Sequence, residues 1–253
     1  MNKIEKQYQT AENLNTRISI HEKYSINQQP FADWIMSHYE IEPNYRILEL
    51  GCGTAGMWKG KLSSIAEGVH LTLTDFSVGM LETAKKNAGD FPCVDYGVVD
   101  IQNIPYKNDS FDMVIANMML YHVPDLDRGL SEVRRVLKPG GKFYCATYGE
   151  HGIAEFINDA LEEYHISGSI GKTFTLQNGG KSLAAHFSVV ERFVRDDALA
   201  VTYIPDFVDY VLSMSSLSSI ENIDAEVLKK AFESKSENGV LYVPKEYGMF
   251  ICE

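Results

Sequence analysis

The stretch "RILELGCGTAGMW", residues 46–58, joins an apolar run to three closely spaced glycines. Gly51, Gly53 and Gly56 fit the pattern G-x-G-x-x-G, which is typical of the turn after the first strand of a nucleotide-binding sheet. Glycine lets the chain turn sharply and keeps side chains away from a ligand. The stretch therefore predicts a nucleotide site. It does not identify the nucleotide, and a chance match without a ligand is an alternative.

Beyond residue 45 the chain alternates short apolar runs with longer amphipathic runs. This alternation is typical of buried parallel strands joined by helices that cover both faces of a sheet. It predicts an α/β fold with a doubly wound, mostly parallel sheet. The expected strands lie at 45–50, 69–75, 93–100, 111–118 and 141–149, with more strand within 188–203 and 240–253, and the expected helices lie at 55–66, 77–89, 126–138, 153–165, 205–216 and 224–234.

Residues 14–39 predict two helices that are interrupted near Ser25–Pro30. We therefore expect an N-terminal helical lid, residues 1–44, followed by a nucleotide-binding domain, residues 45–253. The helices within about 204–237 are expected to form a small helical cap inserted in that domain.

The composition limits the class of partner. Of 253 residues, 35 are acidic and 23 are basic, which gives a formal charge of −12 and argues against a nucleic-acid partner. The four cysteines are far apart and the seven histidines show no zinc spacing, so no metal is expected. No stretch is typical of a signal peptide or a membrane span. We expect a cytoplasmic protein, a monomer or homodimer, that acts on a small molecule.

Acidic residues near the glycines bear on the identity of the nucleotide. Asp75 lies 22 residues after Gly53, where an acid that binds ribose hydroxyls is expected. Glu49 precedes Gly51 by two residues, and a carboxylate there suits the cationic groups of S-adenosylmethionine but repels a diphosphate. Asp100 ends the third expected strand and suits an adenine amino group. S-adenosylmethionine is therefore favoured over a dinucleotide.

A nicotinamide-dependent reductase is a minor alternative, because no tyrosine in the chain has the lysine four residues later that a short-chain reductase of this length is expected to carry.

Several segments together resemble the class I S-adenosylmethionine-dependent methyltransferases, on the small-molecule branch that includes ubiquinone and menaquinone biosynthesis enzymes. "ILELGCGTA" resembles the first motif of the family, with Ala55 in place of its last common glycine. "LTDFSVGML" resembles the second motif, "VVDIQNIPYKNDSFDMVIANMMLYHVPD" the third and fourth, and "VRRVLKPGGKF" the segment that follows. The resemblance covers roughly residues 45–149 and implies a Rossmann-like sheet of seven strands, the seventh antiparallel.

The resemblance also implies which residues bind the cofactor. Gly51, Cys52 and Gly53 are expected at the methionine end, and Asp75 at the ribose hydroxyls. The remaining positions are Phe76 and Met80 beside the adenosine, Asp100 and Ile101 at the adenine, and Asn117 and Met118 near the sulfonium. The alternative is core packing for Phe76, Met80 and Ile101, and capping or turn formation for the two acids.

Methyl transfer from a sulfonium is an in-line displacement in which the protein mainly aligns the reactants and excludes water. We expect an oxygen or nitrogen nucleophile on a small molecule. His122 in "MMLYHVPD" follows the fourth expected strand, at the edge where ligands bind in such sheets, and is the candidate general base. Its alternative role is structural, as a residue that holds its loop through Asp125.

Candidate residues for the acceptor lie in the lid. Arg17, His21 and Tyr24 share one face of a helix at the spacing i, i+4, i+7. Arg17 suits a carboxylate or phosphate, and Tyr24 suits a cation. Tyr148, just after the fifth expected strand, is a further candidate. The alternative for the stripe is a partly exposed helix that touches the edge of the sheet.

Two other functions stay open. A protein that binds S-adenosylmethionine without catalysis needs the same cofactor residues, because methyl transfer requires no obligatory catalytic side chain. A protein or RNA methyltransferase is also possible in principle, although the acidic composition counts against RNA.

Overall fold

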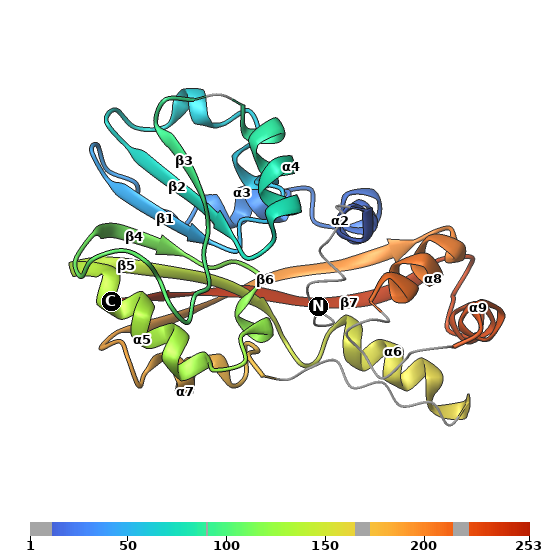
Figure 1. The fold of residues 1–253 in the computed structure, drawn as a ribbon. Coiled ribbons are helices and arrows are strands. Elements are labelled where there is room, and N and C mark those ends of the chain that lie inside the picture. Colours follow the sequence, from blue (N-terminus) through green and yellow to red (C-terminus); the bar gives the residue numbers. More distant parts are fainter. Residues whose placement is uncertain (1–11, 90, 165–172, 215–222) are drawn as a thin grey trace.

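The computed structural model describes residues 12–89, 91–164, 173–214 and 223–253. Its seven-stranded sheet has the order β3-β2-β1-β4-β5-β7-β6, and β7 runs antiparallel to both of its neighbours while the other pairs are parallel (Figure 1). This confirms the predicted doubly wound α/β sheet. The strands are β1 Arg46–Leu50, β2 His70–Asp75, β3 Val94–Val98, β4 Phe111–Ile115, β5 Leu137–Tyr148, β6 Val190–Val201 and β7 Leu241–Cys252.

Helices cover both faces of this sheet because its central strands are apolar on both sides. On one face lie α3 (Phe31–Met36) and α4 (Val78–Ala88); on the other lie α5 (Leu126–Val136) and α7 (Gly179–Leu183) (Figure 1). The start of α4 is fixed locally, because the Ser77 hydroxyl accepts a hydrogen bond from the Met80 amide. Each face thus has its own buried apolar core.

The β6–β7 hairpin extends beyond the rest of the sheet. Its strands pair from Val190–Cys252 to Val201–Leu241, whereas β5 pairs with β7 only over Phe143–Tyr148. The outer half of the hairpin is covered by α2, α6, α8 and α9, which form a third apolar core with it (Figure 1). These helices are α2 Glu12–Tyr24, α6 Ile153–Leu161, α8 Ile204–Ser213 and α9 Ala225–Ser234.

The helix predicted at 55–66 is wrong. The segment forms two short 3-10 turns, η1 (Gly56–Trp58) and η2 (Leu62–Ser64). The reason lies in the backbone, because Ala55 and Gly60 both adopt left-handed conformations, with φ of 53° and 73°, which interrupt a right-handed helix. The glycine turn is therefore followed by a compact loop.

Other boundaries differ slightly from the predicted ones. The helix predicted at 126–138 ends at Val136, and β5 begins at Leu137 instead of 141. The segment 188–203 is one strand, β6. Residues 1–11 of the predicted lid and 215–222 of the predicted cap lie outside the described residues, and the division into lid, domain and cap stays a prediction.

In the described ranges no helix has the length and apolar character that a bilayer crossing requires. Within the same ranges, no three histidine, cysteine or carboxylate side chains are grouped as metal ligands.

Candidate active site

The glycine turn follows β1 and has the backbone that only glycine adopts easily. Gly51 and Gly53 have φ of 69° and 55°, in the left-handed region. A Cβ on Gly51 would lie 2.9 Å from the Met119 Cγ, so the turn also packs closely on the segment after β4. The Cys52 amide donates to the Thr74 carbonyl at 2.8 Å, which ties the turn to β2. A side-chain-free bend thus faces the carboxyl edge of the sheet.

Asp75, the last residue of β2, contacts this turn directly. Its Oδ2 accepts from the Gly53 amide at 2.9 Å, and its Oδ1 accepts from the Ser77 amide at 2.8 Å. Burial raises the pKa of Asp75, and these amide donors oppose that rise. Because each carboxylate oxygen has two lone pairs, Asp75 can accept further hydrogen bonds from a ligand. The predicted ribose acid therefore lies beside the predicted glycine turn.

The predicted adenine residues follow β3. The Val99 amide donates to the Asp75 carbonyl at 3.3 Å, so this segment adjoins the end of β2. The Asp100 carboxylate is half-buried and accepts from the Gln102 amide at 2.8 Å, which is the turn-forming contact that the alternative interpretation expected. Ile101 is buried and belongs to the apolar core beneath α5. A turn contact leaves acceptor sites on the carboxylate, so binding of adenine by Asp100 stays a prediction.

Phe76 and Met80 have opposite exposure. Phe76 is 51% exposed at the carboxyl edge, whereas Met80 on α4 is 1% exposed. An exposed aromatic ring beside the ribose acid is available to a ligand, and a buried methionine fits core packing at least as well. Their contacts with the adenosine stay predictions.

Glu49 is a buried carboxylate in the middle of this site. It is 4% exposed, and its Oε2 accepts from the Trp58 Nε1 at 2.5 Å. Burial raises the pKa of Glu49 to about 7; the Trp58 hydrogen bond lowers it and the charge of Asp75 raises it further. Two acids thus lie at the ends of β1 and β2. A cation bound here would favour their ionised forms.

Tyr39, which follows α3, and Asn117, which follows β4, are in direct contact at this site. The Asn117 Nδ2 donates to the Tyr39 Oη at 2.6 Å, and the Asn117 Oδ1 accepts from the Ala146 amide at 3.0 Å. The Tyr39 hydroxyl in turn donates to the Met57 Sδ at 3.6 Å. Met118, which follows Asn117, has a left-handed φ of 54°, an uncommon conformation that is concentrated at functional sites.

Sequence reasoning missed Trp58, Tyr39 and Met57 at this site. Trp58 and Met57 lie in the segment that was expected to be a helix, and Tyr39 follows α3, about ten residues before the glycine turn. No motif marks these residues. The one signal was Glu49, because a buried carboxylate requires a donor from elsewhere in the chain.

His122 ends a 3-10 turn, η3 (Leu120–His122), just after β4. Its ring lies 4.4 Å from the Tyr121 ring, and the Tyr121 ring lies 4.7 Å from that of Tyr148, between centroids. Burial lowers the pKa of His122 to about 4, and the charge of Arg17 lowers it further. The structure therefore brings Arg17, His122 and Tyr148 to one region, where the imidazole is neutral at neutral pH. The suggested partner, Asp125, instead caps α5 by accepting from the Arg128 amide.

His21 on α2 packs over the β6–β7 hairpin and the cap. Its ring lies 5.7 Å from that of Tyr210 on α8 and 5.5 Å from that of Tyr247 on β7, and its Nε2 is 3.3 Å from the Tyr247 Oη. Tyr24 has a different environment, because its hydroxyl donates to the Asp206 Oδ2 at 2.6 Å. The predicted helical stripe is thus divided between a tyrosine cluster and an ion-pairing contact with α8.

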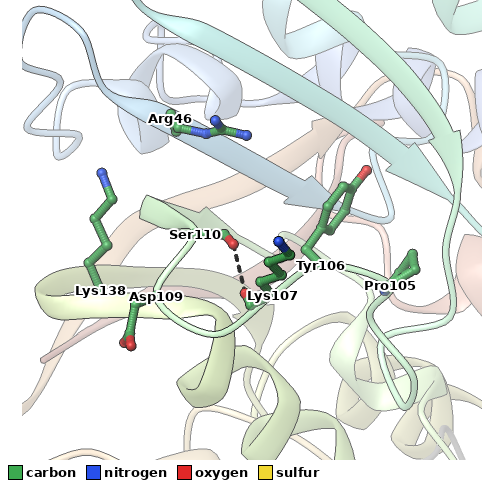
Figure 2. A pocket seen from close by; sticks show the side chains of 7 residues that line it. All are labelled: Arg46, Pro105, Tyr106, Lys107, Asp109, Ser110 and Lys138. Atoms are coloured by element: carbon green, nitrogen blue, oxygen red, sulfur yellow. Dashed lines mark hydrogen bonds between the residues drawn. The ribbon is translucent and has the colours of Figure 1, made fainter.

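A cavity of about 550 Å³ lies at the opposite, amino edge of the sheet. Figure 2 shows Arg46, Tyr106 and Lys107 around it, with Lys138 farther along the same edge. The Lys138 ammonium is held by both oxygens of Asp112, at 2.7 and 2.8 Å. This cavity contains none of the predicted site residues, and ligands of open α/β sheets bind at the carboxyl edge instead.

Residues 48–145 match a protein-family model described as a methyltransferase domain. The ubiquinone/menaquinone biosynthesis C-methyltransferase of Bartonella henselae is 27% identical over 162 residues, which is 62% of this chain and 61% of the relative. The demethylmenaquinone methyltransferase of Streptomyces avermitilis is 35% identical over 117 residues, 46% of this chain and 48% of the relative. The chain thus spans about half to three fifths of the length of these curated relatives.

Solved structures share the fold over most of the chain. Phosphoethanolamine N-methyltransferase 2 of Haemonchus contortus, in complex with S-adenosyl-L-methionine, has a TM-score of 0.59 at 18% identity and covers 96% of this chain and 57% of its own. The [4+2]-cyclase SpnF has a TM-score of 0.62 at 17% identity, and the match covers 100% of this chain and 97% of the cyclase chain. One fold therefore carries different chemistry.

The domain match, the relatives and the sheet topology confirm the resemblance that the sequence motifs predicted. The cofactor of this family is S-adenosylmethionine, and the predicted glycine turn and acids lie within or beside the matched residues. Over residues 48–145 the chain matches a methyltransferase domain, and it is similar to the class I, S-adenosylmethionine-dependent methyltransferases.

Proposed function

We propose that the protein transfers the methyl group of S-adenosylmethionine to a small-molecule acceptor by in-line displacement. The observation that carries the proposal is the group formed by Glu49, Asp75 and the glycine turn, in which a buried acid and a half-buried acid flank a side-chain-free bend. The methyl–sulfur bond breaks as the bond to the acceptor forms, and the sulfur keeps the electron pair, which gives S-adenosylhomocysteine. Alignment in a site that excludes water supplies most of the rate.

On the cofactor side, Gly51, Cys52 and Gly53 face the methionine portion and Asp75 accepts the ribose hydroxyls. Glu49 offers its charge to the cationic groups. Asn117 and Met118 lie near the sulfonium, with Tyr39 as the partner of Asn117. Phe76, Asp100 and Ile101 border the adenosine, with Met80 behind them.

On the acceptor side, His122 takes the proton that the nucleophile loses. Burial lowers the pKa of this histidine to about 4, so it is unprotonated at neutral pH. Arg17, His21 and Tyr148 surround the acceptor. The sequence predicts an oxygen or nitrogen nucleophile, whereas the Bartonella relative is named a C-methyltransferase, so the proposal includes carbon.

A second candidate is a protein that binds S-adenosylmethionine and does not transfer its methyl group. The structural neighbour named a [4+2]-cyclase favours keeping this candidate, because it shares the fold at a TM-score of 0.62. Turnover of S-adenosylmethionine to S-adenosylhomocysteine with any acceptor in a broad metabolite screen rejects the second candidate. Saturable binding without turnover in that screen favours it.

Isothermal titration calorimetry with S-adenosylhomocysteine tests the cofactor site before the acceptor is known. We expect tight binding to the wild-type chain, no binding of NADH, and a loss of affinity of about 100-fold or more in Asp75→Ala. The matched control is Asp95→Ala, which removes a carboxylate that is 72% exposed on the neighbouring strand. Near-unchanged affinity in Asp75→Ala rejects this assignment, and tight NADH binding rejects the function.

A further inference from the structure

The β6–β7 hairpin holds a group of buried charges just beyond the end of β5. Tyr148, the last residue of β5, pairs with Tyr247 on β7, and the next inward-facing position on β7 is Lys245. Lys245 pairs with Asp197 on β6, and Arg195 lies two residues before Asp197. We call Arg195, Asp197 and Lys245 the hairpin charge cluster. Its register places it at the carboxyl edge, next to Tyr148.

The hairpin charge cluster contains two cations and one carboxylate, all deeply buried. The side chains of Arg195, Asp197 and Lys245 are 2%, 0% and 1% exposed. Both cations share one oxygen of Asp197, because Lys245 donates to Oδ2 at 2.5 Å and Arg195 donates to the same atom. The other oxygen of Asp197 accepts from the Asn27 amide at 3.1 Å. One positive charge is therefore left without an opposite charge inside the cluster, which is costly in a protein interior.

The hydrogen bonds of the cluster hold it in place beside the lid. Lys245 also donates to the Ser25 hydroxyl at 2.7 Å, and the Arg195 guanidinium donates to the Gln29 carbonyl. These partners are neutral, so they orient the cations without balancing their charge. The Arg195 Nε is buried and has no hydrogen-bond partner among the described residues.

His21 lies near the hairpin charge cluster and contacts Tyr247, the strand partner of Tyr148. Its Nε2 is 3.3 Å from the Tyr247 hydroxyl, and its Nδ1 is buried with no hydrogen-bond partner in the described ranges. Burial lowers the pKa of His21 to about 3, and the charge of Lys245 lowers it further, so the ring is neutral. A neutral imidazole with an unsatisfied buried nitrogen is a hydrogen-bonding site for a ligand.

Arg17 adds positive charge to the same region. Its charge acts on both His122 after β4 and Tyr210 on α8, so it lies near both of these residues. The walls between these groups are aromatic: the Phe31 ring lies 5.3 Å from that of Tyr247, and the Tyr121 ring lies 4.7 Å from that of Tyr148. The region therefore combines flat aromatic surfaces with the buried positive charge of the hairpin charge cluster.

We propose, on the basis of the proposed function, that the methyl acceptor is a planar carboxylate-bearing molecule whose anionic group binds beside His21, between Arg17 and the hairpin charge cluster. The His21 Nδ1–H donates to the carboxylate while the Tyr247 hydroxyl donates to Nε2. The carboxylate balances the charge of Lys245 and Arg195 across His21. The ring of the acceptor packs among the tyrosines, and its nucleophile is directed toward His122.

The test measures binding to the full chain saturated with S-adenosylhomocysteine. The probes are 4-hydroxybenzoate and its neutral analogue 4-hydroxybenzamide, which have nearly the same shape. We expect the wild-type chain to prefer the benzoate by about tenfold or more. In Lys245→Met we expect the preference to fall severalfold, because the remaining Arg195–Asp197 pair is neutral and only Arg17 and His21 still favour the anion. This variant keeps a balanced ion pair and therefore a folded core.

The matched control is Lys138→Met, which removes the same charge at the amino edge of the sheet and should keep the benzoate preference (Figure 2). His21→Phe keeps the ring and removes the nitrogens, and should also weaken the benzoate selectively. Equal affinity of the wild-type chain for the two probes, binding of neither, or an unchanged preference in Lys245→Met overturns the proposal. Binding of S-adenosylhomocysteine, measured in a separate titration of the ligand-free chain, tests the cofactor site, so the two proposals fail independently.

Discussion

The two ends of the carboxyl edge carry buried or half-buried charges of opposite sign. At the β1–β2 end, Glu49 and Asp75 are acids beside the glycine turn; at the β6–β7 end, Arg195 and Lys245 are cations that share one carboxylate. Both groups lie on the same face of the sheet. Ile47 and Phe193 belong to one apolar core, and Glu49 and Arg195 each lie two residues farther along the same strand and therefore on the same face. The free protein thus contains unbalanced charge of each sign.

Burial acts on the two ends as mirror images. It raises the pKa of Glu49 to about 7 and lowers the pKa of Lys245, so each group is shifted toward its neutral form. A ligand of the opposite sign reverses each shift. S-adenosylmethionine supplies a cation at the β1–β2 end, and we infer that the acceptor supplies an anion at the β6–β7 end. The charges at the two ends are therefore unbalanced in the free protein and become balanced when both reactants are bound.

The largest expected effect concerns His122, which lies between the two ends. In His122→Ala we expect turnover to fall by about 10²–10⁴-fold when the acceptor must lose a proton, because the variant has no group there to accept it. Affinity for S-adenosylhomocysteine should remain unchanged. The measurements are initial rates with saturating cofactor and an acceptor from the screen, and calorimetry for the cofactor.

A matched variant separates this role from a structural one. His122→Asn keeps a polar side chain of similar size to the ring without a basic nitrogen. If His122→Asn retains wild-type turnover, the general base is another group and His122 has no catalytic role between the two ends.

The next effect concerns stability at the cationic end. Asp197→Asn leaves two buried cations without a carboxylate, and we expect the free energy of unfolding to fall by about 3–5 kcal/mol. Lys245→Met leaves a neutral Arg195–Asp197 pair, and should change the same free energy by about 1 kcal/mol at most. Urea unfolding of the ligand-free variants, followed by circular dichroism, measures both. Equal losses in the two variants would mean that the cluster is balanced in the free protein.

The difference between the ends also explains what the sequence predicted. The β1–β2 end is built from neighbours in sequence, because the glycine turn and Asp75 occupy a local motif with fixed spacing. Its geometry was therefore predictable: the Gly53 amide does contact the Asp75 carboxylate. The helix after the turn was wrong because left-handed Ala55 cannot be read from an amphipathic pattern.

The β6–β7 end is built from residues far apart in sequence. The Lys245 ammonium donates to the Ser25 hydroxyl across 220 residues of sequence, and the His21 Nε2 contacts the Tyr247 hydroxyl across 226 residues. Arg195, Asp197 and Lys245 look like ordinary surface charges in an alternating strand, but in the fold they are buried and bind Ser25, Asn27 and Gln29 between α2 and α3. Helical spacing predicted that His21 and Arg17 share one face of a helix as candidate acceptor residues. No pattern in the sequence predicted that the hairpin charge cluster lies near them.

The smallest effect concerns pH and the acidic end. Because the pKa of Glu49 is raised to about 7 in the free protein, this acid is mostly protonated at pH 6 and mostly ionised at pH 8. Cationic S-adenosylmethionine favours the ionised form, so its binding releases a proton below pH 7. Affinity should therefore rise by about tenfold between pH 6 and pH 8 and level off above. His21 and His122, with pKa values of about 3 and about 4, stay neutral throughout this range. In Glu49→Gln the pH profile should be flat, and a slope that survives in this variant would assign the proton to another group at the acidic end.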